Sequence, residues 1–215
     1  MLVSEHMSRN VITVGRQTGV DDALRMMRDQ NIRRLPVVDK QGKLVGIVSD
    51  KDLYLASPSP ASSLDIFELR YLLARLGVEK IMSSPVVTVQ PDTPLEEAAR
   101  IMADKKIGGL PVVDSDQNLV GIITESDLFK IFVALLGARS HGVRVTVLVP
   151  DVKGTLAMLT SAITVNGGNI LSLSMLEGPQ AGQYEVMLKV GDLTLEQVRS
   201  LMGPIRVEVF DIREV

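Results

Sequence analysis

Apolar and polar positions follow the same order in two stretches of the chain, and this order predicts the same five elements in each. A short apolar run comes first, then a segment with apolar residues at helical spacing, then two apolar runs around a polar turn. Such short runs bounded by turn residues are typical of strands. In the first stretch we expect a strand at 11–14, a helix from 20, strands at 35–38 and 44–48, and a helix beginning at Ser49. In the second we expect a strand at 86–89, a helix from 95, strands at 110–113 and 119–123, and a helix beginning at Thr124.

The first helix of each stretch has an apolar face and a start signal. Apolar residues recur at i, i+3, i+4 and i+7, namely Val20, Ala23, Leu24 and Met27, and again Leu95, Ala98, Ala99 and Met102. This spacing predicts one buried stripe on each helix. Thr18 and Thr93 each stand three residues before an acidic residue, which is the spacing of a capping box. Pro94 suits the first helical position, where its missing N–H costs nothing.

The two stretches are copies of one another. Residues 7–54 align without a gap on residues 82–129, and 22 of the 48 aligned positions are identical. A match of this extent at one fixed offset indicates an internal repeat, β-α-β-β-α twice over. We assign the first copy to 1–54 and the second to 78–136. Between them, 55–77 contains a loop rich in serine and proline and a helix-like segment at 64–76.

A different pattern begins after residue 136. We expect a short hinge at 137–142 and a separate domain over 143–215. Its expected elements are a strand at 143–149, a helix after Gly154, strands at 171–175 and 184–190, a helix at 195–201 and a final strand at 205–209. The order β-α-β-β-α-β is that of a ferredoxin-like domain. The predicted fold class is therefore α/β, of the α+β kind, with two repeats followed by this domain.

Composition excludes several classes of function. Cysteine is absent and histidine occurs twice, so disulfides and cysteine-built metal sites are excluded, and a histidine-based triad or metal site has little to draw on. Aromatic residues make up 3 % and the net charge is −3, which argues against a nucleic-acid partner. No run approaches the roughly 18 apolar residues of a membrane span, and the first residues lack a signal-peptide pattern. We therefore expect a cytoplasmic protein with no membrane partner.

Each repeat carries one motif with chemical meaning, Gly-h-h-Ser/Thr-x-x-Asp, where h is apolar. Its residues are Gly46, Ser49 and Asp52 in the first copy and Gly121, Thr124 and Asp127 in the second. A hydroxyl at a helix start suits a phosphate, because unpaired backbone N–H groups lie beside it. An aspartate one turn further on can accept hydrogen bonds from both hydroxyls of a ribose. The same spacing also makes an ordinary helix cap, and on spacing alone the cap is favoured.

The repeated motif, the repeated Leu-Pro-Val-Val-Asp and the opening Val-x-Thr-Val together resemble a tandem pair of CBS domains, a Bateman module. The resemblance implies two repeats related by a pseudo-twofold axis, with clefts that take adenosine nucleotides (AMP, ADP or ATP) or S-adenosylmethionine. It implies no cofactor, no metal and no catalytic residue. The aspartate would hold the ribose, the hydroxyl would lie near the phosphates, and the Leu-Pro-Val backbone would line the base. The implied nucleotide-binding residues are Thr13, Arg33, Leu35, Pro36, Val37, Ser49 and Asp52, and in the second copy Thr88, Gly109, Leu110, Pro111, Val112, Thr124 and Asp127.

The copies differ just before Leu-Pro-Val. The first copy has Arg33 and Arg34, whereas the second has Gly108 and Gly109. Arginine binds phosphate oxygens well, although a solvated charge is the ordinary use of such a pair. Paired glycines let a ligand approach the backbone closely. We therefore expect the two sites to differ in affinity.

Residues 143–215 resemble an ACT domain, through the run Pro150-Asp151-Val152-Lys153-Gly154-Thr155-Leu156 and the later Gly168-Asn169-Ile170. The resemblance implies an amino acid bound where two such domains meet. The candidate residues are Asp151, Lys153, Gly154, Asn169 and Ile170. Lys153 departs from the usual Pro-Gly pair of this loop, so a dimerisation domain without a ligand is the alternative.

A CBS pair followed by an ACT-like domain is similar to the acetoin-utilisation, AcuB-like group of bacterial proteins. We therefore predict a non-catalytic regulatory sensor that binds an adenosine nucleotide, forms a homodimer and modulates a metabolic enzyme. Two alternatives are open: a structural oligomerisation module with degenerate clefts, and a regulatory subunit of an enzyme.

Overall fold

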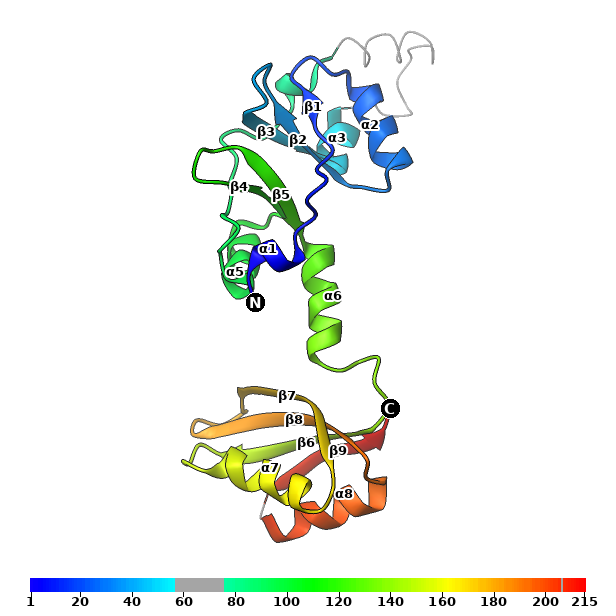
Figure 1. Cartoon of the computed structure of the whole chain (residues 1–215), viewed down its shortest axis with the longest axis vertical. Coiled ribbons are helices and arrows are strands. Elements are labelled where there is room, and N and C mark those ends of the chain that lie inside the picture. Colours follow the sequence, from blue (N-terminus) through cyan, green and yellow to red (C-terminus); the bar gives the residue numbers. More distant parts are fainter. Residues whose placement is uncertain (57–75, 206) are drawn as a thin grey trace. The chain divides into compact units, whose positions relative to one another are not determined.

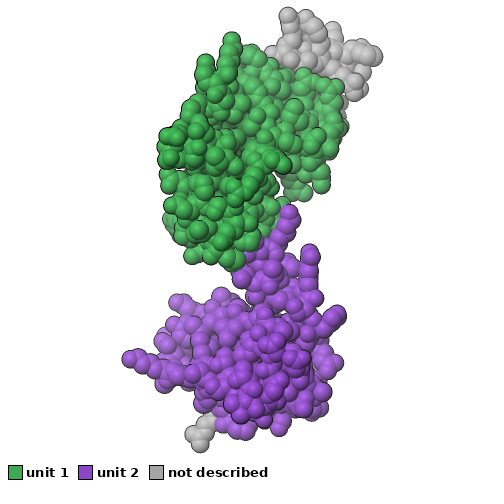
Figure 2. Space-filling view, viewed as in Figure 1, with its two compact units in different colours: residues 1–128 green, residues 129–215 purple. Residues whose placement is uncertain are grey.

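The computed structural model describes residues 1–56, 76–205 and 207–215. They divide into two compact units, Met1–Leu128 and Phe129–Val215 (Figure 2). The helix expected at 64–76 lies, except for its last residue, outside the described residues. Within the described ranges, no helix is both long enough and apolar enough to cross a membrane.

The first unit contains both repeats except for residues 129–135 of their last helix, α6 (Glu125–Leu135), which belong to the second unit (Figures 1 and 2). The elements of the first repeat are α1 (Val3–His6), β1 (Val14–Gly15), α2 (Val20–Asp29), β2 (Arg34–Val38), β3 (Leu44–Ser49) and α3 (Asp50–Ala56). Those of the second are the 3-10 helix η1 (Val78–Lys80), α5 (Leu95–Lys105), β4 (Gly109–Val113), β5 (Leu119–Thr124) and α6 (Glu125–Leu135). β2 pairs antiparallel with β3, and β4 with β5, with a register shift at the equivalent place in each pair. The four strands predicted after the first helices are confirmed.

The start of each repeat differs from the prediction. Of the strand expected at 11–14, only Val14 lies in a strand, β1, which pairs in parallel with β2 and ends one residue later than expected. At 86–89 a single residue, Val89, forms a parallel bridge with Val112. Helix α1 was not expected at all. The strand positions are equivalent in the two repeats, but only a short part of each run meets its neighbour.

The predicted helix caps are wrong. Helix α2 begins after Gly19 and α5 after Pro94, and neither helix receives a side-chain cap there. Pro94 is thus one position earlier than predicted, in extended conformation with φ −59° and ψ 142°. The Thr93 hydroxyl oxygen instead accepts a hydrogen bond from the backbone N–H of Gln90, at 3.0 Å. The threonine therefore closes the turn before the helix.

The two repeats are joined through their first segments, before the first strand of each. Ser8 forms an antiparallel bridge with Ile122 of the second repeat, and Ser83 forms the equivalent bridge with Ile47 of the first. Each bridge consists of paired backbone hydrogen bonds of 2.9 to 3.2 Å. Each repeat thus adds backbone pairing to the last strand of the other, which explains why both belong to one compact unit.

The glycine of the repeated motif leaves room for the two repeats to pair in this way. A Cβ atom on Gly46 would overlap the side chain of Met82, and one on Gly121 would overlap that of Met7. Both methionines lie just before the bridges described above. The motif glycine is therefore explained by close packing between the repeats, independently of any ligand.

The hairpin turns of the two repeats also touch. The ammonium group of Lys43 donates to the backbone oxygen of Asp116 and to the Asn118 side-chain oxygen, both at 2.7 Å. A backbone hydrogen bond from Asn118 is the largest cause that holds the pKa of Asp114 below its ordinary value, and Lys43 adds to it. Lys43 and Asn118 occupy equivalent positions of the two repeats, so this contact lies where the repeats face one another.

The second unit is a four-stranded antiparallel sheet covered on one face by two helices (Figure 1). Its elements are β6 (Val143–Pro150), α7 (Thr155–Val165), β7 (Asn169–Glu177), β8 (Gln183–Gly191), α8 (Leu195–Met202), the 3-10 helix η2 (Gly203–Ile205) and β9 (Glu208–Glu214). The strand order is β7-β8-β6-β9. The core consists of Val143, Val145, Val147, Val149, Leu159, Ile163, Val186, Leu188, Val190, Val198, Met202 and Ile205. The predicted element order is confirmed.

The last strand begins later than predicted. We expected it at 205–209, but Ile205 ends η2 and is buried in the core, and β9 spans Glu208–Glu214. The apolar residue at 205 thus caps the core at the end of α8. Ile205 is buried at the end of a 3-10 helix and not in a strand. An alternating apolar pattern in the sequence cannot distinguish these two causes of burial.

The segment after α6 is fixed to the sheet of the second unit. The Ser172 hydroxyl donates to the backbone oxygen of Leu136, at 3.1 Å, and the Lys189 ammonium donates to that of Gly137, at 2.9 Å. Lys189 is 5 % exposed. A buried cation needs a polar partner, and here the partner is a carbonyl just beyond the end of a helix.

Candidate functional site

The motif of the first repeat forms a compact polar cluster where β3 passes into α3. Both the backbone N–H and the hydroxyl of Ser49 donate to Oδ2 of Asp52, at 2.8 and 2.7 Å. The backbone N–H of Asp52 in turn donates to the Ser49 hydroxyl oxygen, at 3.2 Å. The cluster is therefore a reciprocal cap, as the spacing favoured. It also holds the Asp52 carboxylate in one orientation.

The second repeat reproduces this geometry where β5 passes into α6. The backbone N–H and hydroxyl of Thr124 donate to Oδ2 of Asp127, at 3.1 and 2.7 Å. Both hydroxyls and both carboxylates are partly buried in this arrangement. The fold thus presents two equivalent hydroxyl–carboxylate pairs, one at the end of each hairpin.

The Leu-Pro-Val strands lie beside these pairs, with their side chains turned inward. Leu35, Val37, Leu110 and Val112 are all 0 % exposed, and Pro36 and Pro111 are buried as well. A ligand would therefore meet the backbone of these strands, because the side chains are occupied in the core. Thr13 and Thr88 precede residues that bridge in parallel to Val37 and Val112, so they hold equivalent places in the two repeats.

The two arginines before the Leu-Pro-Val strand of the first repeat have different surroundings. Arg33 is exposed. The Arg34 side chain crosses to the second repeat: a Cβ added to Gly108 would overlap its guanidinium, and one added to Gly109 would lie 3.0 Å from its Cδ. An ion pair of 3.7 Å joins Arg34 to Glu125, the first residue of α6. Sequence reasoning named Arg33 and missed this pair.

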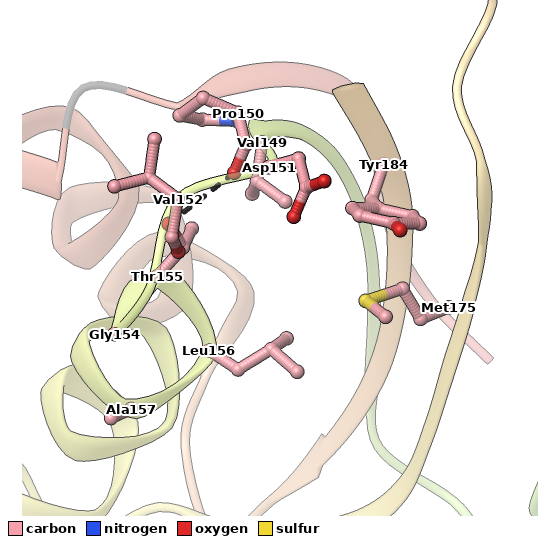
Figure 3. A pocket seen from close by; sticks show the side chains of 10 residues that line it. All are labelled: Val149, Pro150, Asp151, Val152, Gly154, Thr155, Leu156, Ala157, Met175 and Tyr184. Carbon is pink, nitrogen blue, oxygen red and sulfur yellow. Dashed lines mark hydrogen bonds between the residues drawn. The ribbon is translucent and has the colours of Figure 1, made fainter. Parts of the chain in front are cut away.

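The second unit contains a separate pocket of about 260 Å³ (Figure 3). It is lined by Val149, Pro150, Asp151, Val152, Gly154, Thr155, Leu156, Ala157, Met175 and Tyr184. The loop that forms its rim is held by the Thr155 hydroxyl, which donates to the backbone oxygen of Val152 at 2.8 Å. Gly154 adopts φ 92°, a conformation that glycine takes without strain. The lining is mostly apolar, with the Asp151 carboxylate as its charged group.

The structure brings together only part of the set predicted for this domain. Asp151 and Gly154 line the pocket, whereas Lys153 is exposed and is not part of the lining. Asn169 and Ile170 lie at the opposite end of β7 from Met175, where Asn169 pairs with Gly191. Sequence reasoning missed Met175 and Tyr184, which come from strands and carry no motif. Their placement follows from the register of β7 on β8 alone.

Comparisons with known proteins assign the first unit. The CBS domain family matches residues 3–59 and 78–134. The chain belongs to the CBS domain family, with two copies in tandem. CBS pairs are regulatory, non-catalytic modules, so the prediction that this chain is not an enzyme is confirmed. A CBS domain-containing protein of Dictyostelium discoideum is 38 % identical over 136 residues, which cover 63 % of this chain and 94 % of that protein.

Solved structures agree with this assignment. The CBS domain pair of protein MJ0100, in complex with 5′-methylthioadenosine and S-adenosyl-L-methionine, is 30 % identical with a TM-score of 0.53, covering 65 % of this chain and 98 % of that one. The protein CBSX2 in complex with AMP is 35 % identical with a TM-score of 0.50, covering 61 % and 96 %. A Vibrio cholerae protein provisionally assigned to acetoin utilization (AcuB) is 37 % identical with a TM-score of 0.53, covering 65 % and 95 %. Adenosine-type ligands therefore bind CBS pairs similar to this one.

Proposed function

We propose that this chain is a regulatory sensor whose CBS pair binds an adenosine nucleotide or S-adenosylmethionine. The duplicated hydroxyl–carboxylate pair, Ser49 with Asp52 and Thr124 with Asp127, carries the proposal. A carboxylate accepts about four hydrogen bonds over its two oxygens, and the Asp52 cap uses Oδ2. A cap and a ribose site are therefore compatible, and the cap fixes the carboxylate in advance of binding.

The groups around each hydroxyl–carboxylate pair suit the adenine base of such a ligand. The strands at 35–37 and 110–112 can offer a ligand only backbone groups, because their side chains are buried, and Pro36 and Pro111 contribute a C=O but no N–H. Backbone groups discriminate among bases by hydrogen-bond pattern, and Thr13 and Thr88 add a hydroxyl beside each strand. The relatives that carry AMP, 5′-methylthioadenosine and S-adenosyl-L-methionine share the adenosine moiety, which supports adenosine as the recognised part.

Thermal unfolding of the full chain with AMP, ATP, S-adenosylmethionine and 5′-methylthioadenosine, and with UMP as a control, tests this function. At least one adenosine ligand is expected to raise the melting temperature, with no effect from UMP. An unmoved transition throughout the panel would favour a structural module with degenerate sites. Turnover of a nucleotide by the pure protein would instead favour an enzyme subunit.

The second unit is the candidate for binding a second regulatory ligand. We propose that it is a ferredoxin-like, ACT-like domain, and that its pocket takes an apolar amino acid. The observation that favours this ligand is the single carboxylate, Asp151, in a mostly apolar lining that includes Leu156 and Met175 (Figure 3). A carboxylate pairs with an ammonium group, and the apolar walls suit a hydrocarbon side chain.

Calorimetry with leucine, valine and aspartate on the wild type and on Asp151→Asn tests the amino-acid pocket. The apolar amino acids are expected to bind. Asp151→Asn is expected to lower their affinity about tenfold, because it removes one charge-assisted hydrogen bond. Preference for aspartate, or binding that Asp151→Asn leaves unchanged, would overturn the assignment.

We further propose that ligand binding acts by shifting populations of the linked units. Helix α6 begins directly after Thr124, and the carbonyls that follow it are held by Ser172 and Lys189. A ligand at Thr124 and Asp127 would bias this helix, and the segment 137–142 would carry the bias onward. The regulated partner would be a metabolic enzyme, and the AcuB similarity makes acetoin utilisation the first pathway to examine.

A homodimer is the proposed working form. Phe129 and Phe132 of α6 are 69 % and 56 % exposed, and Leu176 of the edge strand β7 is 67 % exposed. Exposed apolar side chains and an open sheet edge both favour association, and twofold dimers are the commonest closed form. Light scattering at micromolar concentration is expected to give twice the chain mass of 23.4 kDa. A mass of one chain would refute the dimer.

A further inference from the structure

A second cavity of the unit Phe129–Val215, the α6 groove, lies along the end of helix α6 and has a volume of about 420 Å³. It is lined by Lys130, Val133, Ala134, Gly137, Arg139 and Ser140. Positions 130, 133, 134 and 137 follow the spacing i, i+3, i+4 and i+7, so they form one stripe along the helix and the turn that ends it. The groove shares no lining residue with the pocket around Asp151, so it is a separate site.

The charged side chains of the α6 groove are both cations. Lys130 lies at one end of the stripe and Arg139 follows its other end, with the apolar side chains of Val133 and Ala134 between them. None of the described residues that line the groove is acidic, although the whole chain has a net charge of −3. Within the described ranges the Arg139 guanidinium makes no hydrogen bond or ion pair, so its donors are open to a ligand.

The end of a helix ordinarily disfavours an anion, because its last carbonyl oxygens lack partners. In α6 these oxygens are occupied. The N–H of Gly137 donates to the carbonyl oxygen of Ala134 and that of Ala138 to Val133, both at 3.0 Å. Gly137 has φ 60°, so the helix closes in a Schellman motif. The carbonyl groups beside the groove are therefore turned into the helix end and do not repel a negative charge at full strength.

A buried cation supports the same wall of the groove from behind. The carbonyl oxygen of Gly137 accepts a hydrogen bond from the Lys189 ammonium, at 2.9 Å, and that of Leu136 accepts one from the Ser172 hydroxyl, at 3.1 Å. Lys189 is 5 % exposed, so its charge is only weakly screened by water. The wall is thus fixed in place, and a third positive charge lies next to it.

We propose that the α6 groove binds a small organic acid with two carboxylates joined by a short hydrocarbon chain. Arg139 would pair with one carboxylate, because a guanidinium matches a carboxylate with two parallel hydrogen bonds, and Lys130 would pair with the other. The chain would lie on Val133 and Ala134. The apolar floor separates the two cations, which favours two acidic groups over a single anion. This site does not depend on the proposed adenosine function.

Calorimetry on the full chain with succinate, glutarate and adipate tests the inference, with butyrate and inorganic phosphate for comparison. At least one dicarboxylate is expected to bind saturably, and butyrate about tenfold more weakly, because it can pair with one cation only. Arg139→Gln is expected to lower the affinity for the dicarboxylate about tenfold. Arg199→Gln is the matched control, since it removes the same charge from an exposed position on α8.

A second variant tests the cavity without changing its charge. Ala134→Leu fills the exposed floor of the groove with a residue that suits a helix, and it is expected to abolish dicarboxylate binding. Ala103→Leu makes the same change at an exposed position on α5 and is expected to leave binding unchanged. The melting temperature of each unliganded variant shows that it is folded.

The outcomes also separate this site from the CBS pair. Simultaneous replacement of Asp52 and Asp127 by asparagine is expected to leave dicarboxylate binding unchanged, and its loss there would move the site out of the groove. Binding that Arg139→Gln leaves unchanged would overturn the assignment. Phosphate that binds as tightly as the best dicarboxylate would show a general anion site and refute the proposed ligand. Absence of saturable binding by all three dicarboxylates to the folded wild-type chain would refute the site.

Discussion

Replacing both Asp52 and Asp127 with asparagine is expected to abolish stabilisation by adenosine ligands. A ligand at 100 times its dissociation constant adds about 2.7 kcal/mol to the unfolding free energy of the wild type. The double variant should show almost none of this gain, because a neutral amide replaces the carboxylate that would accept both ribose hydroxyls. Asparagine still offers an oxygen to Ser49 and Thr124, so the caps and the fold are expected to survive.

Urea unfolding with and without AMP measures this effect, and each single variant shows which site contributes. Asp29→Asn is the matched control, since it removes an exposed carboxylate at the end of α2. A double variant that AMP stabilises as strongly as it stabilises the wild type would contradict the assignment of the aspartates.

Leu35→Ala and Leu188→Ala are expected to cost about 2 to 5 kcal/mol each, and each in its own unit. Both side chains are 0 % exposed, and they belong to two separate hydrophobic cores. Because the cores share no residue, Leu35→Ala should destabilise the unit of residues 1–128 and Leu188→Ala that of residues 129–215.

Hydrogen exchange read by mass spectrometry measures the two units separately in the same experiment, and each variant serves as the control of the other. The protection of backbone amides against exchange is expected to fall in the mutated unit and to stay unchanged in the other unit. An equal fall in both units after either substitution would show that the chain unfolds as a single cooperative body.

The strands of the repeats could be predicted because the same pattern occurs twice. The apolar runs at 35–38 and 110–113 are each followed by an aspartate that begins a polar turn, and both form strands. The helix starts could not be predicted from spacing. A capping box needs its threonine to be the residue before the helix, but the chain inserts Gly19 and Pro94 in extended conformation between them.

The local part of the candidate site was predictable, and the part between the repeats was not. Ser49 and Asp52 are three residues apart, so chain geometry brings them together. Arg34 and Glu125 are far apart in sequence, and only the packing of one repeat on the other makes them neighbours. No pattern within either repeat carries that information.

The same distinction explains the pocket of the second unit. The loop residues Asp151 and Gly154 follow a strand directly and were found from their run of sequence. Met175 and Tyr184 reach the pocket through the register of neighbouring strands, which alternation of apolar residues leaves open.

Isothermal titration calorimetry of AMP into the full chain tests the central claim most directly. We predict saturable binding that the simultaneous replacement of Asp52 and Asp127 by asparagine removes. Absence of heat with AMP, ATP and S-adenosylmethionine alike, from a chain whose melting transition shows it to be folded, would contradict the claim that this CBS pair is an adenosine sensor.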